Sequence, residues 1–98
     1  MGACTFITIA RGMTATSAFA NAIDEARHMH GHGGYTGTIA EKGEFIMVTS
    51  DLLSLEDASA RADQLLQDDD PRISDKWGPA GCIALSTGQF LFFGWASS

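Results

Sequence analysis

Apolar residues alternate with threonine near the start of the chain and then recur at helical spacing. The run Cys4-Thr5-Phe6-Ile7-Thr8-Ile9-Ala10 is β-branched and aromatic, a composition that predicts a strand. After Thr14 or Thr16, either of which can cap a helix, apolar residues return every three or four positions as far as Gly31. This second pattern predicts a helix that ends at the glycine.

A strand pair and a second helix are predicted next. Tyr35 to Ala40 and Glu44 to Thr49 are strand-like and flank a Lys42-Gly43 turn, which is a hairpin signal. A helix then begins at Ser54, because this serine can cap a run with apolar residues at helical spacing, and Pro71 prevents its continuation.

The chain ends with a second predicted hairpin. Arg72 to Pro79 is polar and irregular, and the strands Ala80 to Leu85 and Gln89 to Trp95 follow it around Ser86-Thr87-Gly88. Together the elements predict one domain, residues 1–98, of α+β class in the order β-α-β-β-α-β-β. We expect a mostly antiparallel sheet with two helices on one face.

The two predicted hairpins have similar sequences. Each contains Gly-x-Ile-Ala, a short turn that ends in glycine, an acid or its amide, a phenylalanine and an apolar run; the copies start at Gly37 and Gly81. The match indicates a duplicated helix-hairpin unit, with chance similarity over about ten positions as the alternative. Two such units would place their helix-to-hairpin connections at related ends of the sheet.

The later strands are apolar on both faces instead of alternating with polar residues. Two helices on one face would leave the other face uncovered. This predicts a homo-oligomer, either a dimer or a larger assembly, joined sheet on sheet or edge to edge. The alternative is that loops fold over the second face.

Composition and charge exclude several classes of protein. The 98 residues are 45% apolar and 18% charged, so the chain is neither disordered nor a membrane span. A net charge of −6 argues against a protein that coats nucleic acid. Cys4 and Cys82 lie in apolar runs, and no secretory leader is recognisable, so we expect free thiols and a cytoplasmic location.

Histidines are the first candidate for chemistry. His28, His30 and His32 alternate, and imidazoles are common metal ligands. Because residues two apart in a helix point in different directions, His28 and His30 would not share a face. The sequence therefore assigns no catalytic residue, metal or cofactor, although a small metal-dependent hydrolase that uses His30 and His32 stays an alternative.

The two helix-to-hairpin connections hold a second candidate site. They contain rings that can stack on a base, hydroxyls, and cations that can contact phosphate. These residues are Tyr35, Thr36, Arg72, Lys76 and Trp77. The alternative for Trp77, which precedes Gly78-Pro79, is an apolar packing anchor at the start of a strand.

Three segments resemble a group of small bacteriophage proteins of unknown function. The segments are His32-Gly33-Gly34-Tyr35-Thr36-Gly37-Thr38-Ile39-Ala40-Glu41-Lys42, Asp75-Lys76-Trp77-Gly78-Pro79-Ala80-Gly81 and Phe92-Phe93-Gly94-Trp95-Ala96-Ser97. The resemblance covers about half of the chain and implies no activity or functional residue. It does imply action in the host cytoplasm, where small phage proteins counter host defences.

We therefore expect an oligomeric binding protein that sequesters a nucleotide-like signalling ligand. The main alternative is an inhibitor that binds a host protein through the acidic helix face between Glu56 and Asp70, which includes Asp68-Asp69-Asp70. A solvated helix end is the simpler interpretation of that acidic cluster.

Overall fold

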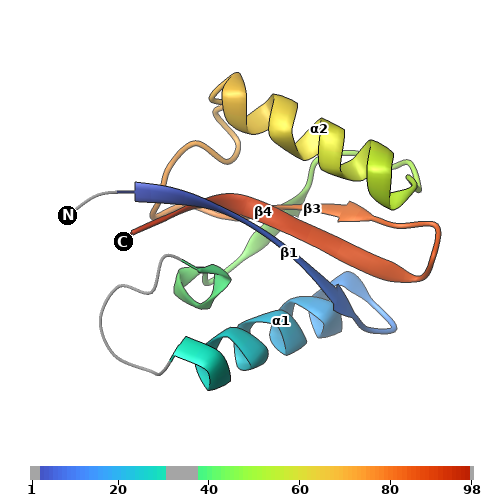
Figure 1. Cartoon of the computed structure of the whole chain (residues 1–98), viewed down its shortest axis with the longest axis horizontal. Helices are drawn as coiled ribbons and strands as arrows, with labels where there is room; N and C mark the ends of the chain where they lie inside the picture. The colour runs from blue at the N-terminus through green and yellow to red at the C-terminus, as the bar shows by residue number, and fades with distance from the viewer. Residues whose placement is uncertain (1–2, 31–37, 98) are drawn as a thin grey trace.

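A single four-stranded sheet lies between two helices. The computed structural model describes residues 3–30 and 38–97. In chain order the elements are β1 (Ala3–Arg11), α1 (Ala15–His30), the short 3-10 helix η1 (Ile39–Glu41), β2 (Phe45–Met47), α2 (Leu55–Gln67), β3 (Ala80–Ala84) and β4 (Gln89–Ser97). Figure 1 shows α2 above the sheet and α1 below it.

The sheet has the order β1-β4-β3-β2. β4 is antiparallel to both of its neighbours, whereas β2 runs parallel to β3. The α+β class is thus confirmed: two helices pack on a mixed sheet in which antiparallel pairs predominate. The parallel pair arises because α2 connects β2 to β3, and a helical crossover returns the chain in the same direction.

Both helices begin at side-chain caps. Thr14 Oγ1 accepts a hydrogen bond from the Ser17 amide at 3.1 Å, and Ser17 Oγ accepts one from the Thr14 amide at 3.1 Å. Ser54 Oγ accepts the Asp57 amide at 3.1 Å at the start of α2. Each cap satisfies amides that the first helical turn leaves without a partner, so the sequence locates both starts correctly.

The helices pack on opposite faces of the sheet, so the expectation that both lie on one face is wrong. Phe92, in the centre of β4, packs in a core with Phe19 of α1. Phe93, the next residue, packs in a second core with Ala62 of α2. Successive strand residues point to opposite faces, so the apolar pattern of β4 reflects one helix on each side.

The first predicted hairpin does not form as expected. Residues 39–41 are the 3-10 helix η1 rather than a strand, residues 35–37 lie outside the described part of the chain, and β2 pairs with β3 instead. Among the described residues the first unit therefore does not repeat the second, in which β3 and β4 form the hairpin as predicted.

The expectation of an oligomer rested on an uncovered face of the sheet, and the structure shows no such face among the residues it describes. Each face of the sheet already carries a helix, so a second copy is not required to cover a bare face (Figure 1). Some large apolar side chains remain exposed, among them Ile7 at 43% and Ile9 at 37%, both on β1. These two exposed residues lie on an edge strand, so they do not make up an uncovered face of the sheet.

Candidate functional site

The connection between α2 and β3, residues 68–79, carries three of the predicted site residues. It leaves the helix through Asp69, whose φ of 51° lies in the left-handed region. Ile73 is fully buried and anchors the middle of the connection in the α2 core. An Asx turn follows, in which Asp75 Oδ1 accepts the Trp77 amide at 2.9 Å. The exposed residues of this loop therefore sit on a fixed backbone.

Lys42 fixes the loop from the other side, and sequence reasoning missed it. Its side chain is 4% exposed, and Nζ donates to the carbonyl oxygens of Asp75, Lys76 and Gly78 at 3.4, 3.1 and 2.9 Å. Burial lowers the pKa of Lys42, and the carboxylates of Asp75 and Glu41 offset part of that shift. A turn lysine is ordinarily solvated, so no sequence signal marked this one.

These hydrogen bonds join two segments that are far apart in the sequence. Lys42 follows η1, just before β2, whereas Asp75 and Gly78 lie in the loop before β3. Since one side chain joins them, the segment before β2 lies against the loop before β3. The parallel pairing of β2 with β3 explains this, because it places the starts of both strands at one end of the sheet. The first predicted connection, residues 28–36, lies mostly outside the described residues, so its position near the second stays a prediction.

Trp77 is an exposed residue of the loop, and the partly buried Lys76 lies beside it. The Trp77 residue is 63% exposed, and Lys76 Nζ lies 5.4 Å from the centroid of its ring. This is within the range of a cation-π contact. An anchor buried at the start of a strand would be largely covered, so the structure does not support the packing alternative for Trp77.

Arg72 has acidic and backbone partners. Nε and Nη2 donate to the two carboxylate oxygens of Asp70 at 3.0 Å each, and Nη1 donates to the Val48 carbonyl oxygen at 3.4 Å. These bonds hold the pKa of Asp70 below its ordinary value. A phosphate at this guanidinium would have to compete with Asp70, so Arg72 offers less positive potential than the sequence suggested.

The remaining predicted site residues cannot be placed. Tyr35 and Thr36 lie outside the described residues, as does His32. His28 is exposed on α1. Among residues 3–30 and 38–97, no group of three histidine, cysteine or acidic side chains is arranged to hold a metal ion.

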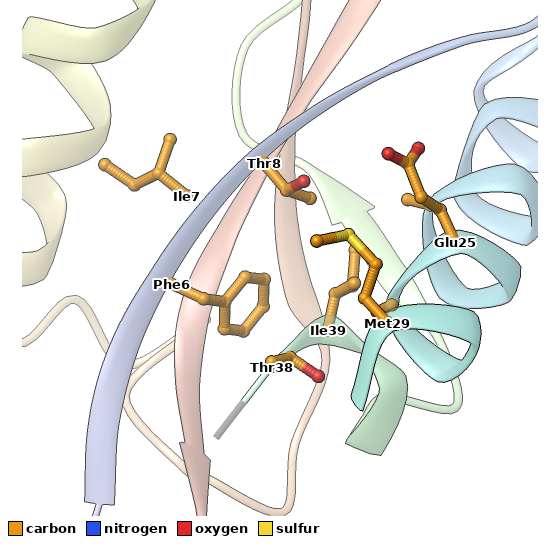
Figure 2. A pocket seen from close by; sticks show the side chains of 9 residues that line it. Phe6, Ile7, Thr8, Glu25, Met29, Thr38 and Ile39 are labelled. Atoms are coloured by element: carbon orange, nitrogen blue, oxygen red, sulfur yellow. The ribbon is translucent and has the colours of Figure 1, made fainter. Parts of the chain in front are cut away.

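A cavity of about 220 Å³ lies between β1, α1 and η1 (Figure 2). Phe6, Ala26, Met29 and Ile39 make most of its wall apolar, with Glu25 at the helix side. Pockets for drug-sized ligands are typically about 300–1,000 Å³, so this one would take only a small molecule. It combines side chains from three separate elements, and such a grouping leaves no pattern along the chain.

The two cysteines differ in burial. Cys82 is buried in β3, and desolvation raises its pKa to about 12. Cys4 is half-buried in β1. A protonated, buried thiol is unreactive, so Cys82 is not placed to act as a nucleophile. Both cysteines lie in strands, as the sequence predicts.

Comparisons with protein-family models, with curated proteins and with solved structures give no significant match. Within the described part of the chain, neither helix has the length and apolar character that crossing a membrane requires.

Proposed function

We propose that this protein is a binding module without catalytic activity, and that it holds a nucleotide-like anion against the loop at residues 72–79. The supporting observation is the Lys76-Trp77 pair, in which an exposed indole carries an ammonium group beside its ring. An indole face stacks on a nucleobase, and the ammonium group contacts phosphate as a point charge.

The loop has features that favour such binding. The buried ammonium group of Lys42 holds three of its carbonyl oxygens, and the Asp75 turn fixes the Trp77 backbone. A loop that is already ordered loses less conformational entropy when a ligand binds. In this proposal Lys42 positions the loop from beneath without touching the ligand.

The resemblance to bacteriophage proteins suggests which ligands to test first. In this proposal the protein acts in the host cytoplasm as an anti-defence factor that sequesters a cyclic nucleotide signal. Such signals combine stacked bases with several phosphates, so Tyr35 and Thr36 remain candidate contacts beside Lys76 and Trp77.

Calorimetric titration with a panel of cyclic dinucleotides and trinucleotides tests the proposal. For a ligand that binds, we expect Trp77→Ala to weaken affinity about 5- to 150-fold, since base stacking contributes about 1–3 kcal/mol per base. Leu55→Ala is the matched control, because Leu55 is an exposed apolar residue on α2. Lys76→Gln should also weaken binding, whereas Arg61→Gln, which removes the same charge from the exposed face of α2, should not.

Two results would contradict this function. One is the absence of heat across the whole panel. The other is a bound nucleotide whose affinity is the same in wild type, Trp77→Ala and Lys76→Gln. Capture of a basic host protein that is lost at high salt and on replacing Asp68, Asp69 and Asp70 by asparagine would instead favour the acidic-surface inhibitor.

A further inference from the structure

The first strand forms an unusually long and uncharged edge of the sheet. β1 has nine residues and pairs only with β4 among the described strands, whereas β2, at the other edge, has three. Proteins usually protect sheet edges with charges, prolines or short strands. Between Ala3 and Ala10 there is neither a charge nor a proline, and Arg11 is the first ionisable side chain apart from the Cys4 thiol.

Hydrogen bonds of β4 and β1 establish which β1 residues direct their backbone outward. The Ser97 amide donates to Glu41 Oε1 at 3.2 Å, on the side of β4 away from β1. Backbone groups alternate in direction along a strand, so the next residue, Ala96, faces its β1 partner Cys4. By the same alternation Phe6 and Thr8 face β4.

The odd-numbered residues of β1 therefore present their amides and carbonyl oxygens at the open edge. Asn21 Nδ2 binds the Arg11 carbonyl oxygen at 2.8 Å, which agrees with this direction. For Thr5, Ile7 and Ile9, no backbone partner beyond β4 is present among the described residues.

The same three residues expose their side chains. Thr5, Ile7 and Ile9 lie on the face that carries α2, because they pair with Trp95, Phe93 and Leu91 of that core. Figure 2 shows Ile7 on the opposite side of β1 from Thr8 and Met29. The open edge thus combines unpaired backbone groups with two partly exposed isoleucines.

We propose that this edge pairs with β1 of a second copy of the chain, antiparallel and around a twofold axis at Ile7. Ile7 then lies opposite Ile7 of the second copy, and Thr5 lies opposite Ile9 in both directions. Each of these three pairs exchanges two backbone hydrogen bonds, so the contact forms about six. The two sheets become one continuous eight-stranded sheet.

The pattern of side chains favours a second copy as the occupant. The strand is self-complementary in this register, since isoleucine meets isoleucine and threonine meets isoleucine. On the other face Phe6 lies opposite Thr8, an aromatic and β-branched pair. Arg11 lies opposite Ala3, so the register brings no like charges together although each copy has a net charge of −6.

Sedimentation of the full chain over a concentration series, with matched lysine variants, tests the pairing. We expect a dimer at micromolar concentration, and Ile7→Lys should raise its dissociation constant at least about tenfold because like charges face each other across the axis. Leu55→Lys adds the same charge to an exposed leucine on α2 and should leave the dimer unchanged. A monomer at every concentration, or equal dissociation constants for both variants, would overturn the proposal.

Oxidative cross-linking in a Cys4→Ser background tests the register and does not depend on the lysine variants folding. The two Ile7 Cα atoms would be about 5.5 Å apart, a separation that a disulfide spans, so Ile7→Cys should give a covalent dimer. Two Ile9 residues would be about 14 Å apart, so Ile9→Cys should stay monomeric on a denaturing gel. Cross-linking of both variants alike, or of neither, would contradict this register. Neither experiment involves Lys76 or Trp77, so the nucleotide proposal can fail independently.

Discussion

The segments Thr38-Ile39-Ala40 and Cys82-Ile83-Ala84 have similar sequences and different backbones. The first lies largely in the 3-10 helix η1, at the margin of the fold, and the second forms most of the strand β3, inside the sheet. Both isoleucines are nevertheless buried, at 2% and 0% exposure. The isoleucine is buried in both segments, whereas the available hydrogen-bond partners determine whether the backbone forms a 3-10 helix or a strand.

Those partners differ clearly. β3 is flanked by β4 and β2, which satisfy its amides and carbonyl oxygens on both sides. In the first segment, Thr38 Oγ1 accepts the Ala40 amide at 3.2 Å, and the Ile39 carbonyl oxygen accepts the Lys42 amide at 2.9 Å. Local hydrogen bonds in the first segment therefore replace the hydrogen bonds between strands that β3 makes. Ile39 and Ile83 pack in cores on opposite faces of the sheet.

The largest expected difference is in thiol reactivity at the equivalent positions Thr38 and Cys82. Burial raises the pKa of Cys82 to about 12, so its thiolate is scarce at pH 8. In a Cys4→Ser background, we expect a cysteine introduced by Thr38→Cys to be alkylated at least about a hundredfold faster than Cys82. Mass spectrometry of timed samples measures both rates, and equal rates would show that β3 is not enclosed.

Truncation of the two isoleucines should destabilise the fold strongly. We expect Ile83→Ala and Ile39→Ala each to lower the free energy of unfolding by about 2–5 kcal/mol. Ile83 should lie at the upper end, because it packs inside the sheet between two strands. Urea denaturation of both variants measures this. A neutral Ile39→Ala would mean that η1 does not close the α1 core.

Substitution of Lys42 and of Thr87, the residues before the two turn glycines, should affect stability very differently. Lys42→Met removes the donor to three carbonyl oxygens and should cost about 2–3 kcal/mol, as for a hydrogen-bonded charged group. Thr87 occupies the equivalent place before the second glycine and is exposed, so Thr87→Met should stay within about 0.5 kcal/mol. Thermal unfolding compares them, and equal losses would argue against the role of Lys42.

The smallest expected difference concerns the equivalent glycines Gly43 and Gly88. Gly88 has a φ of 88°, where a side chain is strained, so Gly88→Ala should cost about 1 kcal/mol. An added Cβ at Gly43 meets nothing within 4 Å, and its φ is not in that region. Gly43→Ala should therefore be neutral or slightly stabilising. If chemical denaturation showed a larger loss of stability for Gly43→Ala than for Gly88→Ala, the backbone conformations described for the two turns would be wrong.

Much of the fold was predictable because it depends on local signals. Apolar spacing and the caps Thr14 and Ser54 located both helices, and the β3-β4 hairpin was predicted with its turn. The apolar pattern of a single strand could not predict on which face of the sheet each helix lies. Phe92 and Phe93 are compatible either with two helical layers or with a sheet that needs a second copy.

The candidate site was predicted only in part. The pair of Lys76 and the exposed Trp77 could be chosen from chemistry alone, because ring and cation are neighbours in sequence. The bonds of Lys42 to a loop more than thirty residues away depend on the parallel pairing of β2 with β3, as does the contact of Arg72 with Val48. Such long-range contacts leave no periodic pattern.

Nuclear Overhauser contacts of isotope-labelled methyl groups test the central claim most directly. The arrangement with one helix on each face predicts that Ile39 belongs to a network containing Phe19 and Phe92, and Ile83 to one containing Leu91 and Ala62. Contacts from α1 and α2 to the same face of β4 would contradict it.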